Sequence, residues 1–143
     1  MPAFGRQSLD HLVTCQEPLR RVLLFVVLHF DCSVLEGVRL PERQQELYDT
    51  GATRTLDSRH LPDDSGLSSA VDVAPYPVVW PNREAMTDGE WMKAYARFYL
   101  FAGFVLAVAA SMGIRLRWGG DWDGDKTLSD QTFDDLVHFE LVD

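Results

Sequence analysis

The chain has 143 residues, of which 46% are hydrophobic and 24% are charged, values typical of one folded globular domain. Thirteen basic residues against 22 acidic ones give a net charge of −9 at pH 7, and the sequence pI is about 4.7. Duplex nucleic acid is bound mainly through Lys and Arg on phosphates, and anionic lipid attracts the same side chains. This acidity therefore argues against a nucleic-acid binder and against a membrane-surface protein.

The two cysteines, Cys15 and Cys32, form no metal-ligand pattern. We expect two buried thiols, although a disulfide between them is also compatible with the sequence. The first ten residues lack the charged start and apolar run of a signal peptide. The longest apolar stretches, 22–28 and 99–110, are shorter than the roughly 20 residues that span a bilayer. We therefore expect synthesis in a cytoplasm and no membrane insertion.

Start and stop signals predict four helices. Their expected first-turn or capping residues are Ser8, Pro18, Pro41, and Thr87 or Asp88. The second helix, which runs to about Phe30, is apolar on nearly every side and should be deeply buried. The third and fourth helices end at glycines, Gly51 and Gly113, as helices often do.

Four short strands are expected, over 32–38, 71–75, 114–118 and 137–141. Apolar and β-branched residues dominate these segments, and the last two alternate as strands do. Loops rich in turn-forming residues lie over 53–70 and 119–134. Helices come first along the chain, and strands then alternate with one long helix. This order predicts a single α+β domain over residues 1–143, with a small mixed or antiparallel sheet packed against helices.

Two of the four histidines have the neighbours that a metal site needs. His60 lies in a loop, Asp72 follows twelve residues later in a predicted strand, and His138 lies at the start of the last strand. Two imidazoles and one carboxylate form a three-ligand zinc set that leaves a position for water, whose pKa falls to about 7. Asp135, three residues before His138, can accept a proton from that water. By itself, the pair Asp134 and Asp135 is also typical of a solvated acidic turn.

Several short blocks, in order, resemble one family. The blocks are Gly37-Val-Arg-Leu-Pro-Glu-Arg-Gln44, Thr53-Arg-Thr-Leu-Asp-Ser-Arg-His60, Ala70-Val-Asp72, Arg117-Trp-Gly-Gly-Asp121-Trp122 and Asp135-Leu-Val-His138-Phe-Glu140-Leu. They span about three quarters of the chain and resemble the zinc D-Ala-D-Ala carboxypeptidases and dipeptidases, in particular the phage endolysins with L-alanyl-D-glutamate endopeptidase activity. The resemblance implies a hedgehog-type zinc scaffold.

The resemblance also implies roles for individual residues. The implied Zn²⁺ ligands are His60, Asp72 and His138. Asp135 is then the general acid/base, Arg39 matches the arginine that meets the substrate, and Ser58 matches a substrate-binding serine. A guanidinium offers fixed donors to a carboxylate or an oxyanion, although Arg39 also fits a structural ion pair. Gln44, in the same block as Arg39, is expected to be structural.

The spacing of the first two implied ligands departs from the family pattern. His60 and Asp72 are twelve residues apart, whereas seven is usual in the family. Residues 62–68 are therefore interpreted as containing a five-residue loop insertion, which costs little in chain entropy. Asp63 or Asp64, on that insertion, would be the alternative ligand, but the strand position of Asp72 favours Asp72.

The loop over 119–134 has a pattern of its own. Asp121, Asp123 and Asp125 occupy positions 1, 3 and 5 of a calcium-type loop. Lys126 stands at position 6, where such loops carry glycine, and Thr132 stands at position 12, where they carry glutamate. Some endolysin relatives are regulated by calcium, so Ca²⁺ is a possible second ion, and a solvated acidic loop is the alternative.

Trp118 and Trp122 flank Gly119-Gly120-Asp121 in the same region. Either these indoles pack against the long helix or they form a wall of the substrate cleft. The small glycines between them would let a substrate strand approach the backbone.

The predicted activity is hydrolysis of the L-Ala–D-Glu bond in the peptidoglycan stem peptide. The alternatives are a D,D-carboxypeptidase or D,D-dipeptidase of the same family, and a non-catalytic zinc-binding module on the same scaffold, against which the acid/base Asp135 argues. We expect a monomeric endolysin, made in the host cytoplasm, that acts on the wall once the membrane is permeabilised. Because wall and protein are both anionic, recognition is expected to come from the cleft rather than from long-range attraction.

Overall fold

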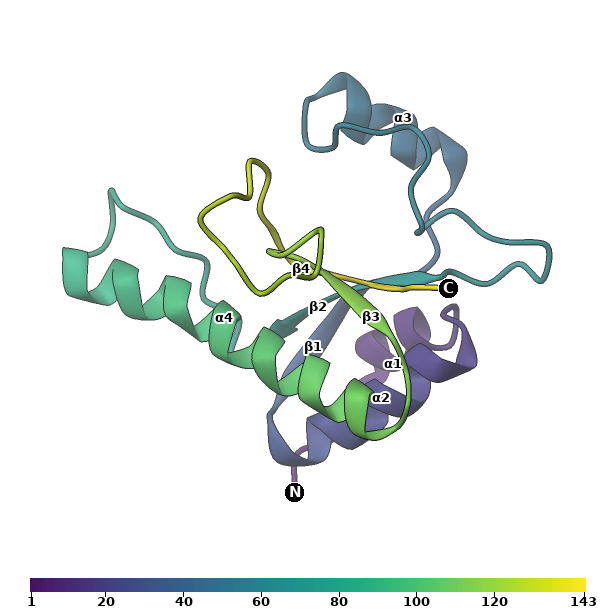
Figure 1. Ribbon diagram of the computed structural model, residues 1–143, viewed down its shortest axis with the longest axis horizontal. Helices are drawn as coiled ribbons and strands as arrows, with labels where there is room; N and C mark the ends of the chain where they lie inside the picture. Colours follow the sequence, from purple (N-terminus) through teal and green to yellow (C-terminus); the bar gives the residue numbers. More distant parts are fainter.

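The computed structural model describes all residues, 1–143, and contains four helices and four strands. The elements are α1 (Arg6–Leu12), α2 (Glu17–His29), β1 (Cys32–Glu36), α3 (Pro41–Asp49), β2 (Ala70–Pro75), α4 (Asp88–Ser111), β3 (Leu116–Gly119) and β4 (Asp135–Leu141). The strands form one sheet in the order β1-β2-β4-β3, and every neighbouring pair is antiparallel. The predicted α+β class is confirmed, and the sheet is antiparallel rather than mixed (Figure 1).

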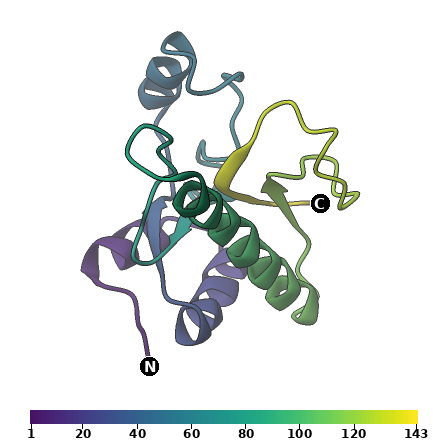
Figure 2. The same ribbon diagram turned by 90° about the vertical axis from the view of Figure 1, so that its left-hand side faces the viewer.

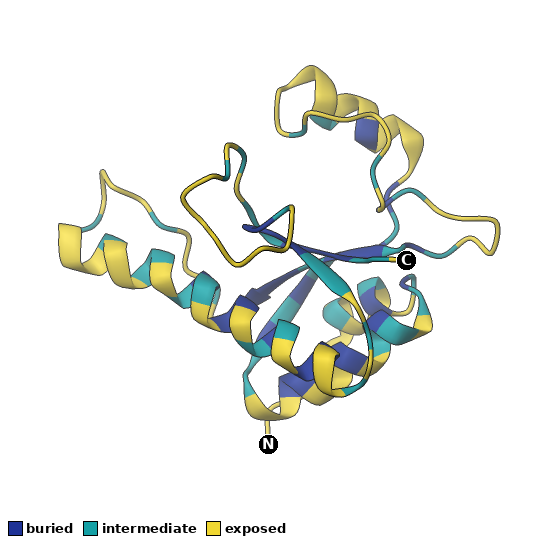
Figure 3. Cartoon of the chain, in the orientation of Figure 1, coloured by how far each residue is buried: buried dark blue, intermediate teal, exposed yellow.

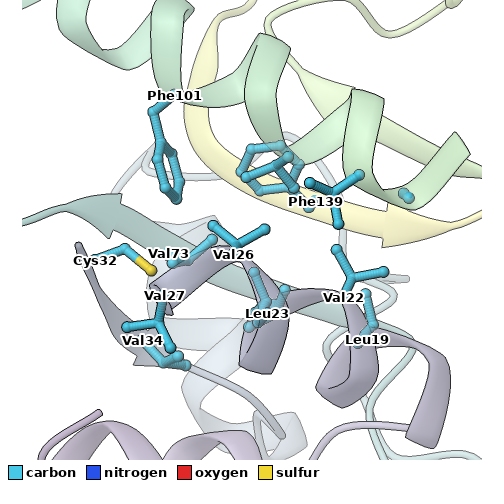
Figure 4. Close-up of a cluster of buried hydrophobic side chains, with 14 of the residues drawn as sticks. Leu19, Val22, Leu23, Val26, Val27, Cys32, Val34, Val73, Phe101 and Phe139 are labelled. Atoms are coloured by element: carbon cyan, nitrogen blue, oxygen red, sulfur yellow. The ribbon is translucent and has the colours of Figure 1, made fainter. Parts of the chain in front are cut away.

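One face of the sheet carries the hydrophobic core. Side chains alternate between the two faces of a strand, and Val71 and Val73 of β2 and Phe139 of β4 are almost fully buried on one of them. They pack with Val26 of α2 and Phe101 of α4 in a single cluster (Figure 4). Figures 1 and 2 show α2 and α4 on this side and α3 on the other. The opposite face is therefore left to polar side chains.

The long helix α4 begins as predicted at Thr87. The Thr87 side chain accepts a hydrogen bond from the Glu90 N–H, and the Glu90 carboxylate accepts one from the Thr87 N–H, which is a capping box. The helix ends before Gly113, whose φ is +71°. With 24 residues and a mean hydropathy of 1.5 over its most apolar window, α4 is long and apolar enough to cross a membrane. Core helices of water-soluble domains share that property, and the inner face of α4 lies in the core.

Two helix predictions are wrong. Ser8 does not cap α1, which begins after Gly5; its hydroxyl instead accepts a hydrogen bond from the Val34 N–H at 3.0 Å and ties α1 to β1. The second helix, α2, is not buried on all sides. Its outward side chains Leu24, Phe25 and Leu28 are 37–48% exposed, because the sheet and α4 cover only one side of it.

Both cysteines are buried and free, as expected. Burial raises the pKa of the Cys15 thiol to about 11 and that of the Cys32 thiol to about 12. Both side chains therefore behave as small apolar core residues, which is the usual state of a buried free cysteine.

Candidate active site

The register between β2 and β4 creates the centre of the site, because it places Asp72 directly opposite His138. Both side chains point to the polar face of the sheet, since the adjacent Val71 and Phe139 point into the core. His60, from the loop after α3, completes the group. Its Nε2 lies 3.0 Å from Asp72 Oδ1 and 3.1 Å from His138 Nδ1. Three residues far apart in the sequence thus converge as predicted.

The three donor atoms have a geometry that fits a tetrahedral ion. The remaining separation, from His138 Nδ1 to Asp72 Oδ1, is 3.5 Å, so the edges of the triangle run from 3.0 to 3.5 Å. Tetrahedral zinc bonds of about 2.0–2.2 Å place ligand atoms roughly 3.3–3.6 Å apart. Two imidazoles and one carboxylate are also a donor set that divalent zinc accepts.

The other imidazole nitrogens are held by hydrogen-bond acceptors. His60 Nδ1 lies 2.8 Å from the Gly37 carbonyl, and His138 Nε2 lies 2.8 Å from Glu140 Oε1. Protons on these nitrogens leave His60 Nε2 and His138 Nδ1 free to face an ion, as outer partners of metal-binding histidines do. Arg117, opposite Glu140 across β3 and β4, lies 3.5 Å from its carboxylate. Sequence analysis missed Glu140, although its place two residues after His138 on a strand puts both on one face.

Neighbouring charges shift the pKa values in this group. Burial lowers the pKa of His138, but hydrogen bonds to Asp72 and Glu140 outweigh it and raise the pKa to about 9. Burial raises the pKa of Asp72, but hydrogen bonds from His138 and His60 bring it well below its usual range. For Asp135, burial and the nearby Asp72 charge raise the pKa. A raised carboxylate pKa suits a group that takes up a proton near neutral pH.

A polar pocket of about 230 Å³, which we call the catalytic pocket, opens over this group. Its lining includes Arg39, Ser58, Asp72, Asp135 and His138. These are the predicted catalytic-site residues other than His60, which lies beneath them at 1% exposure. A larger cavity of about 480 Å³ lies along β3 and contains none of these residues. The converging donor residues therefore lie at the smaller pocket.

Asp135 is held in place by a close approach of β3. A bulge aligns Gly119 with Asp135. A Cβ atom on Gly119 would collide with the Asp135 backbone carbonyl, so only glycine allows β3 to pack at this distance. Gly119 therefore serves the position of Asp135.

Arg39 is 8% exposed and already has several partners. Its Nε and Nη2 donate to the two Glu36 oxygens at 2.9 and 2.8 Å, and Nη1 donates to Gln44 Oε1 at 2.9 Å. A weaker contact joins Nη2 to Asp72 Oδ2 at 3.5 Å. Of the five N–H groups of a guanidinium, one on Nη1 remains for a substrate. Arg39 thus forms the structural ion pair that the sequence also allowed, and it lines the catalytic pocket as well.

Gln44 and Ser58 hold this arrangement together. Most of α3 is exposed (Figure 3). Gln44 is its one buried residue, and the Gln44 Nε2 donates to the Thr55 carbonyl at 2.6 Å. This structural placement agrees with the expectation for Gln44. The Ser58 hydroxyl accepts a hydrogen bond from the His60 N–H at 3.2 Å, so it fixes the loop that carries His60.

The insertion between His60 and Asp72 lies outside the ligand group. Pro62 and Ser68, at the two ends of the insertion, form an isolated antiparallel β-bridge. The Asp63 carboxylate accepts a hydrogen bond from Gln16 Nε2 at 2.5 Å, so it is engaged on the far side of the loop. Neither Asp63 nor the exposed Asp64 belongs to the converging donor set. The insertion therefore leaves the contact between His60 and Asp72 intact.

The two tryptophans have different surroundings. Trp118 is 4% exposed, packs edge-to-face on Tyr99 of α4 and donates to the Leu136 carbonyl at 2.9 Å. Trp122 lies with its ring 5.3 Å from that of His138. Trp118 thus packs against the long helix, whereas Trp122 packs against His138 and is not among the residues that line the catalytic pocket.

The acidic loop after β3 forms a second candidate ion site. Carboxylate oxygens of Asp121, Asp123 and Asp125 lie within 4.8 Å of one another. Asp121 is 7% exposed; its Oδ2 accepts a hydrogen bond from the Lys126 N–H, but its buried Oδ1 has no partner. Lys126 has a φ of 68°, the left-handed conformation that glycine supplies at position 6 of a calcium loop. The backbone at Lys126 therefore has the conformation that position 6 requires, although the residue is not glycine. At position 12, Thr132 cannot supply the bidentate carboxylate that glutamate provides in calcium loops.

Comparisons with known proteins agree with this geometry. No curated protein matched the sequence. Among solved structures, the crystal structure of the L-Ala D-Glu endopeptidase ChiX of Serratia marcescens is similar, with a TM-score of 0.66 and 29% sequence identity over 99% of this chain and 91% of that one. The family model of the phage L-alanyl-D-glutamate peptidases matches residues 2–142. Since that match covers nearly the whole chain, the protein belongs to the phage L-alanyl-D-glutamate peptidase family.

Proposed function

We propose that this peptidase hydrolyses the L-Ala–D-Glu bond of peptidoglycan with one Zn²⁺ held by His60, Asp72 and His138. Family membership gives the bond, and the similar endopeptidase from Serratia marcescens is named for the same bond. The observation that carries the metal assignment is the triangle of three donor atoms with edges of 3.0–3.5 Å. An ion in that position supplies Lewis acidity to the scissile carbonyl and to the attacking water at neutral pH.

The residues of the catalytic pocket then have distinct tasks. Asp135 takes the proton of the attacking water and delivers it to the leaving amine, a role that suits its raised pKa. The unpaired N–H of Arg39 binds the substrate or the developing oxyanion. Arg43 of α3 also lines the pocket, and its only ion pair, with Glu46, is solvent-exposed. It is therefore available to a carboxylate of the stem peptide, and Ser58 completes the binding wall.

The products of digestion test this function against its alternatives. Purified sacculi treated with the protein should release stem peptides that begin with D-Glu and should leave L-Ala on the glycan, which mass spectrometry detects. Loss of a single terminal D-Ala would indicate a D,D-carboxypeptidase instead, and hydrolysis of added free D-Ala-D-Ala to D-Ala, with the sacculi left intact, would indicate a D,D-dipeptidase. Intact sacculi with zinc-loaded protein would indicate a non-catalytic zinc module.

The site and the family also suggest how the protein is deployed. We expect residues 1–143 to act as one catalytic domain and as a monomer, because the converging residues all come from one chain. Action on the cell wall follows from the family. Synthesis in the host cytoplasm, followed by access to the wall after membrane permeabilisation, completes the proposal of a phage endolysin.

Glu36 is predicted to position Arg39, so Glu36→Gln should weaken both stability and activity. Glutamine keeps the shape but removes the charge that holds the buried guanidinium. We expect a loss of about 2 kcal/mol in the free energy of unfolding, less than for a fully buried pair. Because small displacements in a catalytic site are costly, kcat/KM should fall about 10–100-fold. Denaturant unfolding and peptide hydrolysis measure the two effects.

Glu46→Gln is the matched control, because it breaks the exposed pair with Arg43. Solvent-exposed ion pairs contribute little to the free energy of unfolding. This variant should therefore keep the wild-type stability within about 0.5 kcal/mol. Equal effects of the two substitutions would contradict a special role for Glu36.

A second proposal is that the acidic loop binds Ca²⁺. The buried, unpartnered Oδ1 of Asp121 favours it over a solvated loop, because a buried carboxylate oxygen without a partner is costly. Calcium at about 100 times its Kd should raise the melting temperature of the zinc form by about 5–10 °C. Asp121→Asn should abolish that rise, whereas Asp130→Asn, an exposed carboxylate of the same loop, should retain it. A wild-type melting temperature that does not respond to calcium would exclude the site.

A further inference from the structure

A second pocket adjoins the catalytic one, and the family activity does not account for it. This aromatic pocket has a volume of about 260 Å³ and includes Asp135 in its lining, as the catalytic pocket does. Its other walls come from a different part of the chain. They include Trp80 from the segment between β2 and α4, Tyr95 and Phe98 from α4, and Leu136 from β4. A substrate bound at Asp135 therefore has room to extend in two directions.

Trp80 forms an open platform in the aromatic pocket. Its ring stacks on the Phe98 ring at 5.5 Å with an interplanar angle of 20°. Phe98 is 2% exposed, whereas Trp80 is 55% exposed. One face of the indole is thus packed and much of the rest faces water. A fixed aromatic surface of this kind beside a pocket is typical of a ligand-binding position.

The segment that carries Trp80 is anchored without any ligand. Arg97 of α4 donates to the Pro77 and Tyr76 carbonyls at 2.6 and 2.5 Å. At the other end of the segment, Arg83 lies 3.7 Å above the Trp91 ring and 3.1 Å from the Asp88 carboxylate. The platform is therefore preorganised, so ligand binding does not have to order the segment.

The charges of the two pockets indicate which part of the substrate each one takes. Arg39 and Arg43 line the catalytic pocket beside three carboxylates, whereas the aromatic pocket is lined by no basic residue and by two carboxylates, Asp134 and Asp135. On the D-Glu side of the scissile bond, the stem peptide carries free carboxylates. On the L-Ala side, the substrate continues into the lactyl group of a neutral N-acylated amino sugar. The carboxylates of the substrate can pair with guanidinium groups only in the catalytic pocket, and the aromatic pocket repels them.

We propose that the aromatic pocket is a sugar subsite, in which Trp80 and Tyr95 bind the amino sugar that carries the L-Ala. The C–H face of a pyranose ring is apolar, and it buries this surface against an aromatic ring while its hydroxyls stay in water. The inference rests on the proposed function, because the scissile bond sets the orientation of the substrate. It identifies glycan-linked stem peptides, rather than free peptides, as the preferred substrates.

Two matched substrates test the sugar subsite: a muramyl peptide that contains the L-Ala–D-Glu bond, and the same peptide without the sugar. For the wild type we expect kcat/KM to be about tenfold higher with the sugar, mainly through a lower KM. Trp80→Ala should bring the ratio close to one, and Trp80→Phe, which keeps a ring, should retain part of it. Phe25→Ala removes an exposed aromatic ring from α2 and should keep the full ratio.

A binding measurement separates this inference from the proposed function. The peptide-free disaccharide of the glycan repeat, added to the metal-loaded wild type, should shift the indole N–H resonance of Trp80 in NMR spectra. If both peptides are cleaved equally and the disaccharide leaves that resonance unmoved, the sugar subsite is wrong and the peptidase function stands. If neither peptide is cleaved, the proposed function fails, and the disaccharide titration still decides the sugar subsite, by a shift of the Trp80 resonance or by its absence.

Discussion

His138→Ala is expected to remove the bound metal and the wall-lysing activity together. The substitution leaves two donors, His60 and Asp72, and it deprives the Glu140 carboxylate of its hydrogen-bond partner. Loss of an outer hydrogen-bond partner alone lowers metal affinity or activity about 10–100-fold, and loss of a ligand should exceed that. Metal content by mass spectrometry should fall from about one zinc per chain to background. The clearing of a wall suspension, followed on the same samples, should stop.

His29→Ala is the control for this experiment, because His29 lies on the exposed side of α2 against Phe25 and away from the site. It should retain both zinc and lysis. A folded His138→Ala protein that keeps one zinc per chain would show that the ligand set is wrong. A folded wild-type protein without stoichiometric metal would refute the metallopeptidase proposal.

The elements around the site could largely be predicted because their signals are local. Capping residues, prolines and terminal glycines located the helices, and alternation located the strands. The order of the strands and their register are not local properties. Nothing near Asp72 in the sequence indicates that it pairs with His138. Residue types and positions offered these two residues and His60 as one ligand set, and the family resemblance supported that set.

The residues that were missed act through partners distant in sequence or across a strand pair. Glu36 comes opposite Asp72 only because a bulge follows Val34 in β1, and a bulge has no reliable sequence signal. The exposed side of α2 was missed for a similar reason, since its composition does not say how much of the helix the sheet and α4 cover. Trp80 lies in a segment without regular structure, so periodicity could not assign it a role.

Asp135→Asn should lower turnover by orders of magnitude while zinc stays bound, since Asp135 does not belong to the group of three donors. Asparagine preserves the shape of the side chain but cannot take the proton of the attacking water. Loss of a general acid–base catalyst costs about 10²–10⁴-fold in rate, and kcat should carry this loss rather than KM. Hydrolysis of the sugar-free peptide and zinc content, measured on one preparation, check both parts.

The pH profile makes the assignment of Asp135 specific. A base acts only when deprotonated, so wild-type kcat/KM should fall as the pH drops through the pKa of Asp135, which burial and Asp72 raise. The residual activity of Asp135→Asn should lack this acid limb. Asp64→Asn is the control, because Asp64 is an exposed carboxylate on the loop between His60 and Asp72. This variant should keep both the wild-type rate and the acid limb of the pH profile. An Asp135→Asn enzyme with near-normal kcat would mean that another group accepts the proton.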